Sequence, residues 1–303
     1  MTIRYHLSDA MRRFVQRSEA FFPSAVVEQG LAAQRTAYDA MADHFSPPRP
    51  ASLCINDEFL NSVRIRRYRP PQHNRQQRVL FAHGGGWYLG GLDSHDSFCA
   101  SLAHDCNMTV IAVDYRLAPE APYPAGLDDL TAVYRALLEE DPVPPLLVGD
   151  SAGGNLVAAL ALRCRKSGLP KACGQILIYP ALAAPDSLPS HQLLTDAPLL
   201  DRDSINFCWQ IYAQEHPVTD EELIPLQAES LAFLPPAAIF AAEFDPLVDD
   251  ARQYSQRLRQ AGTPAQLTVI RGLVHGALRA ASITDEANLL YQSVCAKVKK
   301  LTN

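Results

Sequence analysis

Short, nearly continuous apolar runs recur along most of this 303-residue chain, and helix-like stretches separate them. Such a run fits a strand that is buried on both faces, as in a parallel sheet covered by helices. Strands and helices that alternate predict an α/β protein with a mostly parallel central sheet flanked by helices. The strand expected at 63–68 alternates between apolar and polar residues, and the strands expected from the apolar runs are 78–83, 109–114, 145–150, 175–179, 237–242 and 266–270. The expected helices are 95–105, 124–140, 152–167, 248–261 and 283–301.

Two segments do not fit this alternation. The first 47 residues carry aromatic and aliphatic side chains at helical spacings, and a proline-rich stretch at 47–50 ends that segment. The stretch between Tyr179 and Ala237 is too long for a loop without secondary structure. We therefore expect a helical insertion there, which includes Ser204–Glu215.

Composition narrows the class of protein. Hydrophobic residues make up 48% of the chain and charged residues 20%, which excludes a disordered chain. The net charge of −6 argues against nonspecific nucleic-acid binding and against a polybasic membrane anchor. The start of the chain lacks the apolar segment of a secretory signal, and no apolar run approaches the roughly 20 residues of a membrane span. We therefore expect a cytoplasmic protein.

The cysteines point to neither a disulfide framework nor a metal site. Their number is seven, and none of their spacings is that of a metal motif. Several lie in apolar runs, such as Cys164 within 156–165. We expect small buried thiols in a reducing compartment, with no metal and no cofactor.

The pentapeptide Gly149–Gly153, which reads Gly-Asp-Ser-Ala-Gly, is the strongest chemical signal in the chain. It fits the G-x-S-x-G pattern and lies between an apolar strand and a helix-like stretch, the context of a nucleophile elbow. A sharp strand-to-helix turn brings backbone segments close together, so glycines flank the serine. The sequence therefore predicts Ser151 as a nucleophile. The alternative is a tight turn with an incidental serine.

A glycine-rich loop, His-Gly-Gly-Gly-Trp at His83–Trp87, directly follows the expected strand 78–82. Consecutive glycines let several backbone N–H groups point at a ligand, and acyl transfer needs such donors because the attacked carbonyl oxygen becomes an oxyanion. A phosphate-binding loop is the rival use of glycines. However, the loop has no Lys or Arg and matches neither phosphate-binding pattern.

A serine nucleophile needs a base, and in this fold the order along the chain is Ser, then Asp or Glu, then His. The histidines downstream of Ser151 are His191, His216 and His275. The first two fall in the expected insertion, whereas His275 follows the last apolar strand, where open α/β sheets place their sites. We therefore predict His275 as the base.

The acid is expected directly after the strand that begins at Ala237. Asp245 stands there, and Pro246 suits a turn into the next helix. Asp249 and Asp250 fit the first turn of that helix, where the helix dipole stabilises negative charge. Glu243 is the other candidate, although it falls within or at the end of the strand.

These motifs, taken together and in this order, resemble the bacterial hormone-sensitive-lipase-like esterases, a group of α/β-hydrolases that includes acetyl esterases and arylesterases. The resemblance extends over about residues 63–300. The motifs that carry it are His83–Trp87, Asp114–Glu120, Gly149–Gly154, Asp245–Leu247 and His275–Gly276.

The resemblance implies an α/β-hydrolase fold with a Ser151–Asp245–His275 triad and no metal. It implies an oxyanion hole formed by the N–H groups of Gly85, Gly86 and Ala152, with Gly84 in support. It also implies a helical cap over the site, so that 48–303 is the catalytic domain and the cap comprises 1–47 and about 182–222. Asp114–Glu120 is interpreted as a brace for the site.

The expected substrates are small esters with short acyl chains. Trp87 and Asp150 are expected to lie at the substrate pocket, although packing within the cap explains Trp87 equally well. The family often has an aromatic residue two positions after the histidine, and Ala277 stands there instead, which suggests a wider pocket beside His275.

Three other activities use the same triad and stay open at this point: those of an amidase, a peptidase and a lactonase. A hydrolase-like regulator that binds a partner is a further alternative. We expect a monomer or a homodimer.

Overall fold

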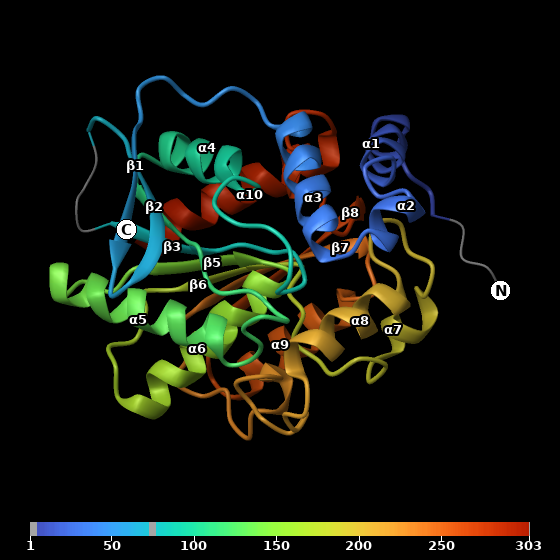
Figure 1. Cartoon of the computed structure of the whole chain (residues 1–303). Helices are drawn as coiled ribbons and strands as arrows, with labels where there is room; N and C mark the ends of the chain where they lie inside the picture. Colours follow the sequence, from blue (N-terminus) through green and yellow to red (C-terminus); the bar gives the residue numbers. More distant parts are fainter. Residues whose placement is uncertain (1–4, 73–76, 303) are drawn as a thin grey trace.

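An eight-stranded sheet forms the centre of the computed structural model, which describes residues 5–72 and 77–302 (Figure 1). The strand order is β1-β2-β4-β3-β5-β6-β7-β8. The pairs β1–β2 and β2–β4 are antiparallel, and the other neighbours are parallel. The strands are β1 (Cys54–Leu60), β2 (Val63–Arg69), β3 (Arg78–Ala82), β4 (Thr109–Val113), β5 (Leu146–Asp150), β6 (Gln175–Ile178), β7 (Ala237–Phe244) and β8 (Ala265–Val274).

Helices cover both faces of this sheet, which confirms the predicted α/β class. One hydrophobic cluster lies between the sheet and α5, α6 and α9, and a second cluster lies between the opposite face and α4 and α10. All five helices begin and end within two residues of the expected ranges. Their bounds are α4 (Asp96–Cys106), α5 (Ala125–Glu140), α6 (Ala152–Ser167), α9 (Val248–Gln260) and α10 (Asp285–Thr302).

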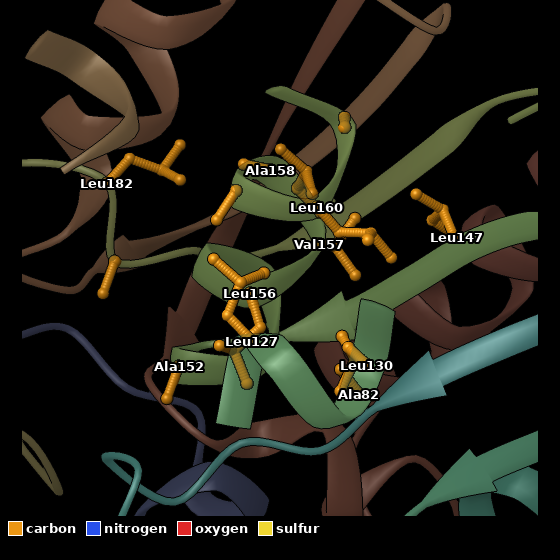
Figure 2. Close-up of a cluster of buried hydrophobic side chains, with 14 of the residues drawn as sticks. Ala82, Leu127, Leu130, Leu147, Ala152, Leu156, Val157, Ala158, Leu160 and Leu182 are labelled. Atoms are coloured by element: carbon orange, nitrogen blue, oxygen red, sulfur yellow. The ribbon is translucent and has the colours of Figure 1, made fainter. Parts of the chain in front are cut away.

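The central strands are apolar along their whole length because both of their faces are covered. In β5, Leu147 faces one cluster while Leu146 and Val148 face the other, and all three are fully buried. Figure 2 shows side chains of α6, among them Leu156 and Val157, in one cluster with Leu147 of β5 and with Leu127 and Leu130 of α5. Burial on both faces is the physical origin of the apolar runs seen in the sequence.

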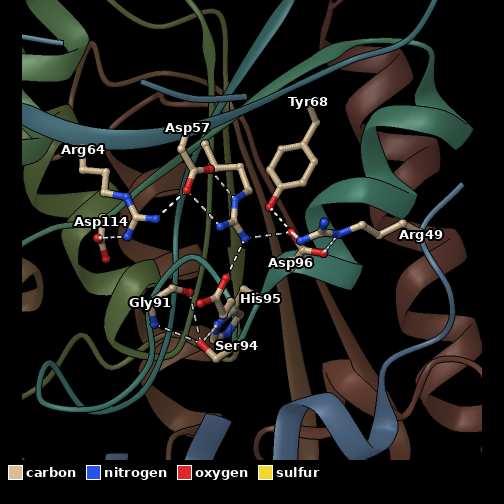
Figure 3. A network of polar contacts seen from close by, with 11 residues as sticks. Arg49, Asp57, Arg64, Tyr68, Gly91, Ser94, His95, Asp96 and Asp114 are labelled. Carbon is tan, nitrogen blue, oxygen red and sulfur yellow. Dashed lines mark hydrogen bonds and ion pairs between the residues drawn. The ribbon is translucent and has the colours of Figure 1, made fainter. Parts of the chain in front are cut away.

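The edge of the sheet differs from the expectation in two ways. Strand β1 was not predicted, because the three residues at its centre, Asn56–Glu58, are polar and none of its residues is fully buried. Strand β2 was predicted to alternate, yet the adjacent Arg66 and Arg67 are both buried. Carboxylates explain this burial, as Figure 3 shows around Asp57 and Asp96. The carboxylates that bind the two arginines are Asp57, Asp93 and Asp96 for Arg66, and Glu58 and Glu140 for Arg67.

Short helices from two distant parts of the chain lie together beside this sheet (Figure 1). The predicted helical start contains α1 (Asp9–Glu19), α2 (Ser24–Glu28) and α3 (Leu31–Phe45), and its first four residues lie outside the described range. The insertion contains α7 (Pro189–Leu193), α8 (Arg202–Ala213) and the 3₁₀ turn η1 (Pro225–Gln227). Helix α8 begins two residues earlier than expected, because the Asp201 carboxylate accepts the Ser204 N–H at 2.7 Å and caps the helix.

Helix α3 is bound to the rest of the molecule by the Arg35 guanidinium. This side chain donates to the carbonyl oxygens of Tyr88 and Ala118, at 2.8 and 3.0 Å, and forms a two-pronged ion pair with Glu120. Tyr88 directly follows the glycine-rich loop, and Ala118 lies within the Asp114–Glu120 segment. The position of α3 is therefore linked to the segments that surround Ser151.

The cysteines are all free, and four of them are buried as expected: Cys99, Cys106, Cys164 and Cys295. Cys54 and Cys173 are exposed, so the expectation of buried thiols is wrong for these two. No helix within residues 5–72 and 77–302 is long and apolar enough to cross a membrane.

Candidate active site

Ser151 lies on the turn between β5 and α6, with φ 53° and ψ −118°. A positive φ is unfavourable for a residue with a Cβ, so the surrounding structure must impose it. Close backbone packing does this, because a Cβ at Gly153 would collide with the carbonyl groups of Ala82 and His83. A Cβ at Gly149 would likewise collide with the backbone of Gly153. The strained turn therefore depends on both flanking glycines.

A chain of hydrogen bonds links Ser151 to two side chains from later strands. The Ser151 Oγ lies 2.8 Å from His275 Nε2, and His275 Nδ1 lies 2.7 Å from Asp245 Oδ2. His275 directly follows β8, and Asp245 directly follows β7. The Asp245 side chain is fully buried, and its other oxygen accepts the Leu247 N–H at 2.8 Å. The imidazole is thus oriented by a fixed carboxylate on one side and faces the serine on the other.

The other acidic residues considered as the orienting acid lie elsewhere. The Glu243 carboxylate, at the end of β7, accepts the Gly272 N–H at 2.8 Å. Asp249 and Asp250 lie in the first turn of α9, as expected. Asp250 binds His191 at 2.7 Å, so this histidine of the insertion already has a different carboxylate partner.

The glycine-rich loop lies next to Ser151 and offers free backbone donors. The Gly84 N–H is not one of them, because it donates to the Asp150 carboxylate at 2.8 Å. Within the described part of the chain, no hydrogen bond uses the N–H groups of Gly85, Gly86 or Ala152. The Gly84 N–H is therefore engaged with Asp150, whereas the N–H groups of Gly85, Gly86 and Ala152 have no hydrogen-bond partner among the described residues.

His83 and Tyr115 brace this loop from behind. The Tyr115 hydroxyl donates to the His83 carbonyl oxygen at 2.8 Å, and the two rings are stacked with centroids 4.2 Å apart. Burial lowers the pKa of His83 to about 3, and the neighbouring His95 adds to the effect, so this imidazole is neutral in the working range of pH. Tyr115 lies in Asp114–Glu120, a segment interpreted from the sequence as architectural.

His95 is a site residue that the sequence analysis missed. Its Nε2 lies 3.4 Å from Asp150, and its Nδ1 lies 2.9 Å from the Ser94 hydroxyl. Burial by itself raises the pKa of Asp150, but the nearby His95, the Gly84 N–H and the charge of Arg279 outweigh it, so the pKa lies below its usual value. Asp150 is thus an ionised buried anchor for the loop. No local motif marks His95, because its partner is distant in sequence.

Trp87 packs against helix α8 and also reaches the cavity. Its side chain is 2% exposed and stacks on Tyr212 with a centroid distance of 4.3 Å, and Trp209 lies 4.5 Å away. These two partners belong to α8, so Trp87 joins the glycine-rich loop to the insertion. Trp87 also lines the cavity described next.

A cavity of about 770 Å³ opens onto Ser151 and His275. Its walls come from α1 to α3, the glycine-rich loop and α8, and most of its lining is apolar. Ala277, two positions after His275, is fully buried and is not among the lining residues. Lining residues from the helices include Phe14, Phe22, Leu31, Tyr38, Met41, Ile205, Phe207 and Trp209.

No group of three or more His, Cys, Asp or Glu side chains that could hold a metal ion occurs in the part of the chain that the structure describes.

The fold and the comparisons with known proteins identify the class of protein to which this chain belongs. Residues 79–279 match the family described as the alpha/beta hydrolase fold, and the chain belongs to that family. Carboxylesterase NlhH of Mycobacterium tuberculosis is 40% identical to this chain over 244 residues, which cover 77% of this chain and 76% of the relative. Ethyl acetate hydrolase of Pseudomonas putida is 36% identical over 253 residues, which cover 78% and 79% of the two chains.

The solved structures narrow the class further. An esterase from the bacterial hormone-sensitive lipase family matches with a TM-score of 0.91 at 26% identity, over 98% of this chain and 99% of the other. The protein is therefore an α/β-hydrolase esterase of the hormone-sensitive-lipase-like group.

Proposed function

We propose that Ser151, His275 and Asp245 form a catalytic triad that hydrolyses carboxylic esters through an acyl-enzyme. The observation that carries the proposal is the continuous hydrogen-bond chain from the Ser151 hydroxyl through His275 to the buried Asp245 carboxylate. A serine hydroxyl is a poor nucleophile unless a base removes its proton. His275 Nε2 is within reach of that proton, and Asp245 orients the ring.

In the proposed first step, the Ser151 Oγ attacks the ester carbonyl carbon while His275 takes the hydroxyl proton. The carbonyl oxygen becomes an oxyanion, which accepts hydrogen bonds from the N–H groups of Gly85, Gly86 and Ala152. His275 then protonates the leaving alcohol, and the C–O bond breaks to leave an acyl group on Ser151. Water then attacks this acyl group while His275 takes its proton. The bond between the acyl carbon and the Ser151 Oγ breaks, His275 returns the proton to the Oγ, and the acid is released.

We propose small esters with short acyl chains as substrates. The name of the Pseudomonas putida relative, ethyl acetate hydrolase, supports a small ester. We also propose that 1–47 and about 182–222 act as a cap over a catalytic domain of 48–303. The support for this division is that α1, α3 and α8 all contribute side chains to the wall of the Ser151 cavity.

Replacement of the nucleophile tests the triad. We expect Ser151→Ala to lower kcat/KM for p-nitrophenyl butyrate by at least about 10³-fold, because the remaining groups have no nucleophile to activate. The exposed Ser230, which is not among the cavity-lining residues, supplies a matched control, and Ser230→Ala should keep its activity. Circular dichroism of both variants checks the fold.

Covalent labelling gives an independent readout. An alkyl p-nitrophenyl phosphonate should react once per wild-type chain, at Ser151, and should leave Ser151→Ala unlabelled. A folded Ser151→Ala variant that retains wild-type ester hydrolysis would show that another residue is the nucleophile.

A further inference from the structure

Arg279 brings a cationic side chain to the cavity that contains Ser151 and His275. It lies in the 3₁₀ turn η2 (Ala277–Ala280), four positions after His275, and it lines the cavity wall. No other lysine or arginine within residues 5–72 and 77–302 lines this cavity. A single guanidinium in a mostly apolar wall is a specific feature that ester hydrolysis itself does not require.

The guanidinium of Arg279 has few partners for its hydrogen-bond donors. One nitrogen donates to the Tyr38 hydroxyl at 2.7 Å, and another lies 3.7 Å from the Met41 sulfur. The guanidinium carbon lies 4.7 Å from the centre of the Tyr38 ring. A guanidinium has five N–H donors. The hydroxyl is thus the one good acceptor that this group has among the described residues.

Two of the buried arginines in the sheet, Arg66 and Arg67, have surroundings that differ from those of Arg279. Arg66 and Arg67 each contact two or more carboxylates within 4.0 Å. No described carboxylate lies within that distance of the Arg279 guanidinium. Asp150 is close enough to interact electrostatically with the guanidinium of Arg279, but that carboxylate already binds the Gly84 N–H and faces His95. The fold therefore leaves the cation of Arg279 without a direct counter-ion.

The charged residues on the cavity wall determine which sign of charge a ligand must have to bind there. Three acidic residues line the cavity: Glu19 and Asp203 are exposed, and Asp150 is already bound by the Gly84 N–H and faces His95. Arg279 is largely covered and lies near His275 in sequence. A carboxylate is the anion whose two oxygens match the paired N–H groups of a guanidinium. Such a pair is strengthened where apolar walls exclude water.

We propose that Arg279 binds a free carboxylate on the substrate, so that the preferred esters are monoesters of dicarboxylic acids. The proposal rests on the proposed role of Ser151 as the nucleophile. The ester carbonyl lies at Ser151, the apolar wall contacts the methylene spacer, and the second carboxylate accepts N–H groups from Arg279. Arg279 is thereby a specificity residue and takes no part in bond making.

Matched substrate pairs test this proposal through a ratio of activities. The kcat/KM for monoethyl adipate is divided by that for ethyl hexanoate, and monoethyl succinate and glutarate test the spacer length. We expect Arg279→Gln to lower the best of these ratios by at least about 10-fold, as befits the loss of charge-assisted hydrogen bonds. Arg271 is exposed on β8 and is not a lining residue, so Arg271→Gln removes the same charge and should leave the ratio within about 2-fold.

Ratios that are the same in wild type and Arg279→Gln for all three spacers would overturn the proposal. If Arg279→Gln does not fold, competitive inhibition of the wild-type enzyme decides. Adipic acid monoamide, which carries a carboxylate, should bind at least about 10-fold more tightly than hexanamide, and equal binding would overturn the proposal.

The two proposals can fail separately. An active Ser151→Ala variant would contradict the triad, while calorimetric binding of the monoamide to that same variant would still report on Arg279. An inactive Ser151→Ala with an unchanged ratio in Arg279→Gln would contradict only the carboxylate site.

Discussion

At the scale of single residues, the geometry of the site depends on positions that have no space for a side chain. Ser151 has a positive φ because α6 starts against the end of β3, and this contact leaves no space for a Cβ at Gly153. The atoms that such a Cβ would meet belong to Ala82, the last residue of β3, and to His83, the first residue of the glycine-rich loop. The same close approach therefore positions the serine and the proposed oxyanion donors relative to each other.

Gly153→Ala tests this coupling. We expect the free energy of unfolding to fall by about 3 kcal/mol, since backbone atoms must move to admit the methyl group. The kcat/KM should also fall, because the displaced backbone leads into Gly84–Gly86. Chemical denaturation and esterase assays measure the two effects.

Gly168→Ala is the matched control for this prediction. Gly168 ends α6 with φ +68°, and a Cβ there would have no neighbour within 4 Å. We expect a loss of only about 1 kcal/mol from the backbone conformation and unchanged activity. Equal losses for the two variants would contradict the packing argument.

At the scale of elements, the insertion is held to α9 by one buried carboxylate. The Asp250 side chain accepts the N–H groups of Leu182 and Ala183 at 2.7 and 2.8 Å and binds His191 of α7 at 2.7 Å. Helix α7 has only five residues and could not persist alone. The position of the insertion over the site thus depends on this polar contact as well as on apolar packing.

The His191–Asp250 pair predicts a pH dependence of stability. Burial raises the pKa of Asp250. Burial alone lowers the pKa of His191, but Asp250 outweighs this and raises it above the usual value. Folding therefore favours a proton on the pair, so its stabilisation is present below the usual histidine pKa of about 6.5 and is lost as pH rises through the raised value.

We accordingly expect the free energy of unfolding to decrease as the pH rises above about 6.5, and His191→Gln to flatten this decrease. Urea denaturation at a series of pH values measures it. His216, a histidine of the insertion that is exposed, supplies the control variant His216→Gln. The same slope in wild type and His191→Gln would contradict the assignment.

At the scale of the whole molecule, the cavity over Ser151 is built by segments that lie far apart in the sequence. Side chains from α1, α3 and α8 meet above the carboxyl ends of β5, β7 and β8. Its wall is apolar in most places, but Gln34 of α3 and Arg279 of η2 interrupt it with polar groups. The cavity thereby has space for a substrate, and its wall contains polar groups to which a long hydrocarbon chain offers no hydrogen bond.

This arrangement predicts a preference for short acyl chains. We expect kcat/KM for p-nitrophenyl acetate and butyrate to exceed that for the decanoate by at least about 10-fold. The reason is that a decanoyl chain would cover the Gln34 and Arg279 side chains and remove their water without replacing its hydrogen bonds. A steady-state series under one set of conditions measures the order, and a preference for the decanoate would contradict it.

Much of the site could be predicted because its signals are local. Glycines beside Ser151 mark a turn that only glycine permits, and His275 and Asp245 each follow an apolar strand whose end is visible in the sequence. The alternation of apolar runs and helices predicted the sheet and its five covering helices for the same reason, since burial on both faces leaves a continuous apolar pattern.

The sequence by itself therefore determined the class of fold, the succession along the chain of every strand except β1 and of the five covering helices, and the residues from which the proposed triad is drawn. Only the tertiary structure decided that Gly84 binds Asp150, that His95 braces that carboxylate and that Arg279 stands in the cavity wall without a counter-ion. The physical reason is distance along the chain. Periodicity and turn chemistry act between near neighbours, whereas these contacts join segments that meet only when the sheet and the helices above it have formed.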